Sequence, residues 1–224
     1  MKIIAINGSP RKKDNTATLL EKALEGAANK GAQTKLIHLY DLNYKGCLSC
    51  FSCKRLGGKS YGKCAVKDDL FDIFDQIEKA DALLLGSPIY FGEITGAMRS
   101  FLERLFFQYL VYDKAHTVLF PGKLTTGFIF TMNAPEHFLK EIKYDMKFKG
   151  YEGILKRFFG TAKTLVVTDT WQFADYSKYE TSSIDVDAKA ARRRDVFPLD
   201  CEKAATLGAE LVTPEVTFSP SQEV

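Results

Sequence analysis

The sequence predicts an α/β fold in which a parallel sheet of five strands carries helices on both of its faces. Short runs rich in Ile, Leu and Val alternate with segments whose apolar residues recur at the spacing of a helix. Five repeats of this alternation are typical of a three-layer domain with a parallel sheet. In the 224-residue chain 46% of the residues are hydrophobic, which is enough to bury a core of that kind.

The strands are predicted from short apolar runs that end in turn or polar residues. The first, Lys2–Asn7, is rich in Ile and precedes Gly8-Ser9-Pro10, as expected of a buried strand that leads into a turn. The second, Lys35–Tyr40, alternates around Leu36 and Leu39. The remaining three strands are predicted at Ala82–Gly86, Thr125–Thr131 and Thr164–Thr168.

The helices are predicted from apolar residues that lie three and four positions apart. In the first, Thr16–Lys30, Leu19, Ala23 and Ala27 share this spacing, and the pattern stops before Gly31. The same pattern predicts helices at Asp69–Lys79, at about Thr95–Tyr109, between His137 and Phe159, and at Asp200–Leu211.

One segment does not fit the repeat and is interpreted as an insertion after the fifth strand. Asp169–Pro198 is irregular but aromatic, since it contains Trp171, Phe173, Tyr176 and Tyr179. It is either a surface excursion that packs its rings on the body, or a wall over the ligand or a dimer contact.

The chain is otherwise interpreted as one domain, residues 1–212. The tail, residues 213–224, contains two prolines and many polar residues and is predicted to be poorly ordered. The run Arg192-Arg193-Arg194 inside the insertion is expected on the solvated surface.

Composition favours small-molecule ligands. Lys plus Arg number 31 against 28 Asp plus Glu, and a net charge of +3 argues against nucleic acid or an anionic membrane as partner. No apolar run approaches the roughly 18 residues of a membrane span, and the first residues do not resemble a signal peptide. We therefore expect a cytoplasmic protein, whose five cysteines are free thiols or ligands rather than disulfides.

The loop after the first strand has the chemistry of a phosphate site. It places hydroxyls, an amide and a cation before a helix N-terminus, where backbone N–H groups and the helix dipole favour an anion. Ser9 and Thr16 can donate, Arg11 can neutralise a dianion, and Asn15 can cap the helix. The dinucleotide motif GxGxxG and the Walker motif are both absent, which favours a phosphomonoester over a pyrophosphate.

A second motif follows the third strand, and the two together resemble a known family. Gly86-Ser87-Pro88-Ile89-Tyr90-Phe91-Gly92-Glu93 precedes the segment from Thr95 to Arg104. With Gly8-Ser9-Pro10-Arg11 and Asn15-Thr16, this motif is similar to those of NAD(P)H-dependent FMN reductases and iron–sulfur flavoproteins, over residues 1 to about 170. The resemblance implies a flavodoxin-like strand order of 2-1-3-4-5, bound FMN, NAD(P)H as electron donor, and a homodimer.

The resemblance also implies which residues hold FMN. A flat apolar ring favours flat side chains, close backbone and a few donors, which the second motif offers. After the fourth strand, Thr131-Met132-Asn133-Ala134 replaces the glycine-rich turn more usual in the family, and Asn133 is a candidate donor to the ring. The implied contacts are Ser9, Arg11, Asn15, Thr16 and Ala17 for the phosphate, and Pro88, Ile89, Tyr90, Phe91 and Gly92 for the ring.

No catalytic side chain is expected, because the flavin itself accepts hydride and the protein supplies position and electrostatics. The three histidines, His38, His116 and His137, are scattered along the chain and indicate neither a triad nor a metal site.

The cysteines form a separate candidate site. Cys47, Cys50 and Cys53 run as CxxCxxC, and Cys64 follows after ten residues. Thiolates at this pitch can hold a 4Fe–4S cluster, although iron–sulfur flavoproteins have a shorter last gap. Zinc is an alternative that lacks its usual paired spacing, and a redox disulfide and a set of reduced thiols without metal are the remaining interpretations.

The sequence therefore predicts an FMN-dependent oxidoreductase that passes electrons from NAD(P)H to a quinone, a free flavin or another small acceptor. Two alternatives stay open. One is an iron–sulfur flavoprotein that carries electrons to protein partners, and the other is an FMN-binding regulatory module.

Overall fold

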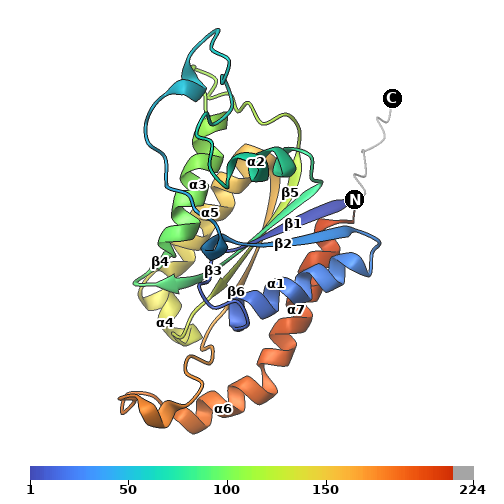
Figure 1. Cartoon of the computed structure of the whole chain (residues 1–224). Helices are drawn as coiled ribbons and strands as arrows, with labels where there is room; N and C mark the ends of the chain where they lie inside the picture. The colour runs from blue at the N-terminus through green and yellow to red at the C-terminus, as the bar shows by residue number, and fades with distance from the viewer. Residues whose placement is uncertain (214–224) are drawn as a thin grey trace, which may run out of the picture.

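The computed structural model describes residues 1–213 (Figure 1). In this part of the chain six strands form one sheet. Five of them run parallel in the order β2-β1-β3-β5-β6, which confirms the predicted flavodoxin-like order. These strands are β1 (Lys2–Asn7), β2 (Gln33–His38), β3 (Ala82–Tyr90), β5 (Leu124–Thr131) and β6 (Gly160–Val167).

The sixth strand, β4 (Glu93–Ile94), is not a predicted element and pairs antiparallel with the end of β3. It turns the second motif into a short hairpin, in which Tyr90 is opposite Glu93 and Ile89 is opposite Ile94. The predicted third strand ends at Gly86, whereas β3 continues to Tyr90 because the hairpin adds paired residues.

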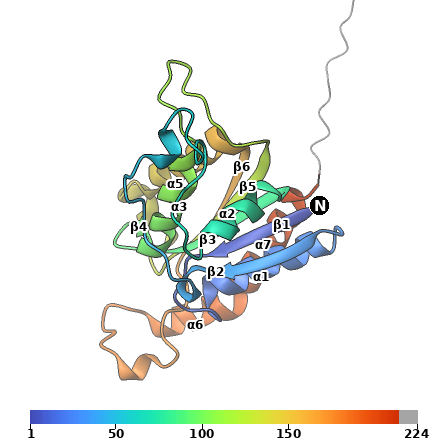
Figure 2. The same cartoon turned by 45° about the horizontal axis from the view of Figure 1, so that its top comes forward.

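Helices cover both faces of the sheet (Figures 1 and 2). Three of the predicted helices are found with small shifts at their ends, as α1 (Asn15–Ala28), α2 (Phe71–Glu78) and α3 (Gly96–Tyr109). The helix expected between His137 and Phe159 is two helices, α4 (Glu136–Glu141) and α5 (Tyr144–Phe159). The last predicted helix is α7 (Phe197–Leu211), which begins three residues early.

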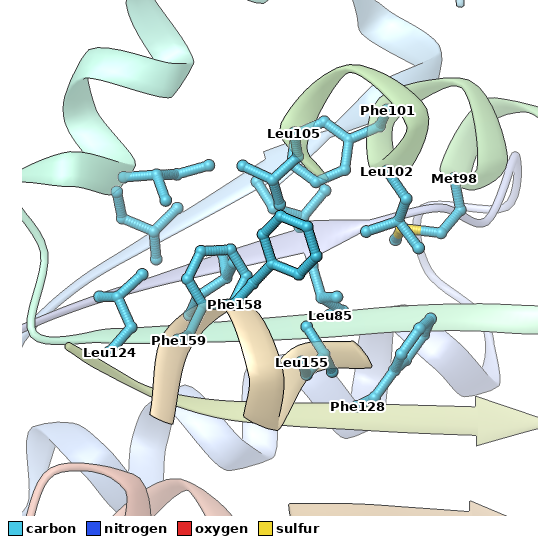
Figure 3. Packing of buried hydrophobic residues seen from close by; sticks show 14 of the residues in the cluster. Leu85, Met98, Phe101, Leu102, Leu105, Leu124, Phe128, Leu155, Phe158 and Phe159 are labelled. Atoms are coloured by element: carbon cyan, nitrogen blue, oxygen red, sulfur yellow. The ribbon is translucent and has the colours of Figure 1, made fainter. Parts of the chain in front are cut away.

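The alternation of β1 divides the core into two layers. Ile3 and Ala5 pack with α1 and α7, whereas Ile4 and Ile6 pack with α2, α3 and α5, because successive side chains of a strand face opposite sides. Figure 3 shows the second layer, where α3 residues such as Phe101 and Leu105 meet Phe158 and Phe159 of α5. These layers fix the strand ends, and therefore the loops that follow them.

The insertion is less irregular than predicted. It contains the helix α6 (Val186–Asp195), whose N-cap Asp185 accepts a hydrogen bond from the backbone N–H of Ala188 at 2.9 Å. The sequence did not reveal α6 because most of its residues are charged or small, so no apolar period marks it. The predicted poorly ordered tail, apart from Thr213, lies outside the described residues.

The arginine run is not simply solvated surface. Arg192 pairs with Asp200 of α7 at 2.7 Å, and both side chains are largely buried. Arg193 donates to the Asn15 side chain at 3.0 Å, and its guanidinium lies 4.0 Å from the ring centroid of Phe197. Arg193 and Arg194 are both exposed as expected, and Arg194 pairs with the neighbouring Asp195.

Among residues 1–213, none of the helices has the length and apolar character that a membrane span needs.

Candidate functional site

The loops that follow β1, β3, β5 and β6 enclose a cleft at the carboxyl ends of the strands, with about 520 Å³ of empty volume. This is where ligands bind in open parallel sheets. Eight of the predicted FMN contacts line this one cleft: Ser9, Arg11, Asn15, Thr16, Pro88, Ile89, Tyr90 and Asn133.

Local hydrogen bonds shape the loop after β1. The backbone N–H of Ser9 donates to Asn7 Oδ1 at 2.9 Å, and the N–H of Arg11 donates to Ser9 Oγ at 3.1 Å. The Asn7 side chain is itself held by His38 Nδ1 at 2.9 Å. Beyond the end of β1, these hydrogen bonds to short polar side chains take the place of the hydrogen bonds between strands. The loop therefore has a defined shape before any ligand binds.

The start of α1 is open to an anion. Its N-cap residue is Asp14, not Asn15 as expected, and the Asp14 side chain makes no capping bond. The first N–H groups of the helix therefore lack a side-chain acceptor and add their partial positive charge to the cleft. Asn15 instead donates from Nδ2 to the Trp171 carbonyl at 2.7 Å.

Hydroxyl groups join the loops on the floor of the cleft. Thr16 and Thr131 share a hydrogen bond of 2.8 Å between their side chains, which links α1 to the end of β5. Thr95, the N-cap of α3, donates to the Gly8 carbonyl at 2.7 Å and accepts from Met98 N–H at 3.2 Å. The relative positions of the first and second motifs are therefore fixed by buried bonds.

Three predicted contacts do not line the cleft. Ala17 belongs to α1 and is fully buried. Phe91 and Gly92 are the central residues of the β3–β4 hairpin, both with positive φ (50° and 84°), as in a two-residue type I′ turn. Phe91 is fully exposed to solvent. A Cβ on Gly92 would also lie only 2.8 Å from Tyr144 Oη. The positive φ of the turn and this close contact therefore explain the glycine without a ligand.

The insertion forms the outer wall of the cleft through Trp171 and Gln172. Arg11 Nη1 donates to the Gln172 carbonyl at 2.5 Å. The Trp171 ring packs edge-on against Tyr176, with centroids 4.5 Å apart, and Tyr176 is 5% exposed. The aromatic segment therefore lines the cleft through Trp171 and buries Tyr176 among its own rings.

A buried lysine from α6 fixes Asn133. Lys189 Nζ donates to the Asn133 carbonyl at 2.9 Å and to its Oδ1 at 2.5 Å, and pairs with Asp169 at 2.5 Å. Because the ammonium engages Oδ1, the amide nitrogen is the group of Asn133 that can donate to a ring.

Sequence reasoning missed several residues of this cleft. The contact of Lys189 with Asn133 could not be predicted from the sequence. Its helix carries no apolar period, and the two residues are 56 positions apart in the chain. Thr131, Met132, Thr170 and Gln172 line the cleft. The sequence places the first two in a turn and the last two in the insertion, and it indicates no ligand contact for any of them. Their position at or after the ends of β5 and β6 could have identified these four residues, because those strand ends face the same cleft.

The four clustered cysteines also come together, in a second cavity of about 350 Å³. Cys47, Cys50 and Cys53 belong to the loop that follows β2, and Cys64 returns the chain to the same place. The cavity is closed by Arg104 and Gln108 of α3, together with apolar side chains such as those of Phe51 and Phe107. All five cysteines of the chain are free thiols.

Polar contacts hold this loop against the end of α3. Lys54, next to Cys53, donates to the carbonyls of Phe107, Gln108 and Leu110, and so caps the helix C-terminus. The backbone N–H of Cys64 donates to Gln108 Oε1 at 3.0 Å. The cysteine positions therefore depend on contacts with one helix rather than on the sheet.

The electrostatics of the cavity differ from one cysteine to the next. Burial raises the pKa of the Cys53 thiol. Hydrogen bonds from Ser52 lower the pKa of Cys50. Burial acts to lower the pKa of Arg104, but its interactions with Asp68 and Cys64 outweigh this effect and raise it, so this guanidinium is a permanent buried cation.

Two nitrogen atoms in the cavity have no partner among the described residues: Arg104 Nε and Gln108 Nε2. Unpartnered buried donors beside four cysteines fit an electron-rich occupant, and four cysteine side chains are the ligand set of an iron–sulfur cluster. In residues 1–213, no three His, Cys, Asp or Glu side chains are grouped as ligands of a metal ion.

Known proteins place the chain in a family. A family model described as NADPH-dependent FMN reductase matches residues 1–125, more than half of the 224-residue chain. The chain belongs to the NADPH-dependent FMN reductase family. The matched residues include the phosphate loop, the β3–β4 hairpin and the four clustered cysteines, and the family predicted from the sequence motifs is confirmed.

Curated relatives of this FMN reductase family member are iron–sulfur flavoproteins. One from Archaeoglobus fulgidus is 38% identical over 104 residues, 46% of this chain and 48% of its own length. Another, from Methanocaldococcus jannaschii, is also 38% identical over 104 residues, 46% of this chain and 51% of its own length. The chain thus spans about half the length of the curated relatives it matches.

Solved structures share the fold over nearly the whole chain. An NAD(P)H:quinone oxidoreductase from Methanothermobacter marburgensis aligns with a TM-score of 0.69 and 15% identity, covering 96% of this chain and 98% of that one. An azoreductase from Bacillus anthracis aligns with a TM-score of 0.66 and 15% identity, covering 94% and 99%. At such identities the likeness shows the fold alone, and it includes the part beyond residue 125.

Proposed function

We propose that the strand-end cleft binds FMN and that the chain transfers electrons from NAD(P)H through this flavin to a small-molecule acceptor. The observation that carries the proposal is the convergence of four strand-end loops on one cleft, which offers Arg11, hydroxyl groups and N–H groups at one end and apolar side chains at the other. FMN, with its phosphate and flat ring, has the matching polarity.

The polar end suits the phosphate. The side chains of Ser9 and Thr16 supply hydroxyls, Arg11 supplies charge, and the first turn of α1 supplies N–H groups without a side-chain cap. Arg11 and Asn15 now donate to the carbonyls of Gln172 and Trp171, and a phosphate would offer them stronger, charged acceptors.

The apolar end suits the ring. Pro88, Ile89 and Tyr90 present flat and aliphatic surface from the β3–β4 hairpin, and Asn133 presents an amide held by Lys189. When bound, FMN supplies a ring that accepts hydride from a nicotinamide nucleotide, so the residues need only bind it, orient it and exclude water. Trp171 stands where it can contact an acceptor such as a quinone, a free flavin or an azo compound.

Anaerobic reduction tests this function directly. The full chain, loaded with FMN, is mixed with NADH or NADPH, and flavin absorption near 450 nm is followed by stopped flow; we expect bleaching on mixing and recovery when a quinone is added. The same mixture with free FMN at equal concentration is the control. If bound flavin is reduced no faster than free flavin by either nucleotide, the reductase proposal is contradicted and a regulatory FMN-binding module takes its place.

A second function, electron transfer through an iron–sulfur cluster, is favoured by the cysteine cavity. Four cysteines line one space together with two buried donors that lack a partner in the described residues. We propose that Cys47, Cys50, Cys53 and Cys64 hold a 4Fe–4S cluster, as the names of the relatives suggest. Anaerobically purified protein would then contain about four iron and four sulfide per chain by the cluster's stoichiometry. Flavin bands without iron would contradict this role.

We also propose that the chain forms a homodimer. Apolar side chains near the cysteine loop and α5, including Phe51, Tyr112 and Ile154, are exposed in the single chain. Burial of such surface is what favours association of two copies. Light scattering during size-exclusion chromatography should give twice the 25.1 kDa mass of one chain, and a single-chain mass across a broad concentration range would contradict the proposal.

A further inference from the structure

Arg104 and Gln108 lie one turn apart on α3, so they share one face of the helix. Each side chain is 2% exposed and lines the cysteine cavity. Arg104 Nε and Gln108 Nε2 have no hydrogen-bond partner among residues 1–213. A buried donor without a partner destabilises the fold, and more so when it is charged. Two of them side by side indicate that the cavity is shaped for an occupant that accepts hydrogen bonds.

The remaining atoms of both side chains are held in place. Arg104 pairs with Asp68 and donates to the carbonyls of Lys45 and Val66, each at 3.3 Å. Gln108 Oε1 accepts from the backbone N–H of Cys64 at 3.0 Å. These bonds fix the amide so that oxygen faces Cys64 and nitrogen is the free end. Neither donor can be satisfied by a simple rotation without breaking bonds that position the cysteine loop.

The rest of the cavity offers few acceptors besides sulfur. Its other lining residues are the four cysteines and the apolar or aromatic Leu48, Phe51, Ala65, Val66 and Phe107. A neutral apolar occupant would leave both donors unsatisfied, and a cation would be repelled by the Arg104 guanidinium. An anionic group rich in sulfur satisfies the donors and the charge together.

We propose that Arg104 Nε and Gln108 Nε2 donate hydrogen bonds to sulfur atoms of an iron–sulfur cluster held by the four cysteines, and thereby raise its reduction potential. This inference rests on the iron–sulfur role proposed above. The reduced cluster carries one more electron and one more negative charge than the oxidised cluster. N–H donors and a buried cation therefore stabilise the reduced form more, which is how the protein sets such potentials.

Two variants that leave the charge unchanged test the proposal. Gln108→Met removes the amide donor, and Arg104→Lys removes Nε while it keeps a cation for Asp68. The full chain is purified anaerobically, its iron, sulfide and melting temperature are measured, and the cluster potential is found by a redox titration followed by EPR. For each variant we expect the ratio of reduced to oxidised cluster at a fixed potential to fall roughly tenfold, about 59 mV for a one-electron couple.

The control is Gln76→Met on α2, which makes the same chemical change outside the cavity and should keep the wild-type potential. If Gln108→Met loses the cluster because Cys64 N–H has lost its acceptor, Arg104→Lys decides the case. A variant with full iron and sulfide and an unchanged potential would overturn the inference and leave the iron–sulfur role standing. A wild-type chain that takes up no iron or sulfide would overturn both.

Discussion

The two cavities of this molecule differ in what their polar groups already bind. In the strand-end cleft Arg11 and Asn15 donate to the carbonyls of the insertion, and Thr16 bonds with Thr131. In the cysteine cavity Arg104 and Gln108 each keep one donor without a partner among the described residues. A ligand in the cleft exchanges existing bonds for stronger ones, whereas an occupant of the cysteine cavity supplies bonds that are otherwise missing.

The two regions also differ in how they are built. Four loops that the sheet holds in register form the cleft, so no single segment determines its shape. The cysteine cavity is made by one long loop folded against one helix, and a few contacts of α3 keep it in place. Substitutions in the cleft should therefore change binding more than stability, and the reverse should hold around the cysteines.

The largest effect is expected from Asp68→Ala. Asp68 is the ionic partner of Arg104, and their side chains are 17% and 2% exposed. Removal of one member of a buried pair leaves the other uncompensated and costs roughly 3 to 5 kcal/mol. Urea denaturation of the metal-free chain measures the loss. The control is Glu210→Ala, because its pair with Lys163 is exposed and should be worth at most about 1 kcal/mol. Equal losses would contradict the difference between the two regions.

Arg11→Ala should act on binding instead. Loss of a charge-assisted bond to the phosphate weakens FMN affinity by about 1.5 to 3 kcal/mol, roughly 10- to 100-fold. Arg11→Lys should lose less, since charge survives without the fork of the guanidinium. Fluorescence titration of the apo-protein measures both. The control is Lys13→Ala, which removes a positive charge from the same loop at a residue that does not line the cleft. An equal loss of FMN affinity in this variant would mean that Arg11 acts through long-range charge and not through a direct bond to the phosphate.

Trp171→Ala should separate acceptor binding from FMN binding. The hydrogen bond between Asn15 and Trp171 uses the backbone carbonyl of Trp171, which the alanine variant keeps. We therefore expect the ratio of kcat/KM for two acceptors to change about tenfold, or 1.4 kcal/mol, with little change in FMN affinity. The control is Phe173→Ala, whose ring stacks on Tyr179 with centroids 4.1 Å apart and does not line the cleft. A Trp171 variant that melts early yet treats both acceptors as wild type does would remove this residue from the acceptor site.

The smallest effect concerns the β3–β4 hairpin at acid pH. A hydrogen bond from Lys147, at 2.7 Å, holds the pKa of Glu93 below its usual value. A carboxylate with a lowered folded-state pKa contributes stability above that value and loses it as pH falls through it. Both side chains are about half exposed, so the contribution is below about 1 kcal/mol. Glu93→Gln should therefore melt slightly earlier than wild type at pH 7, and the difference should shrink as the pH falls through the lowered pKa of Glu93. A constant difference across this range would contradict the assignment.

The sequence predicted most of the sheet because the central strands β1, β3 and β5 are largely buried and appear as short apolar runs. It also predicted that Ser9, Arg11 and Thr16 lie together between a strand and a helix start, where all three line the cleft. It could not predict α6, because a helix held by a cap and by ion pairs has no apolar period. Lys189 was missed for that reason.

Tertiary contacts account for the other differences. Phe91 and Gly92 belong to a motif of the family, but their backbone closes a hairpin turn and turns Phe91 to solvent. That outcome depends on the pairing of β4 with β3, which adjacent residues alone do not specify. The unpartnered donors of Arg104 and Gln108 depend on a helix and a loop far apart in sequence, and no local pattern reports them.

The central claim is that the polar end of the strand-end cleft grips a phosphate, and comparison of FMN with riboflavin tests it most directly. The two ligands share the ring and differ only by the phosphate. Because the loop offers at least two charged or N–H contacts to that group, the apo-protein should bind FMN roughly 100-fold more tightly than riboflavin, or about 2.7 kcal/mol. Equal affinities for the two ligands, or binding of neither, would contradict the claim.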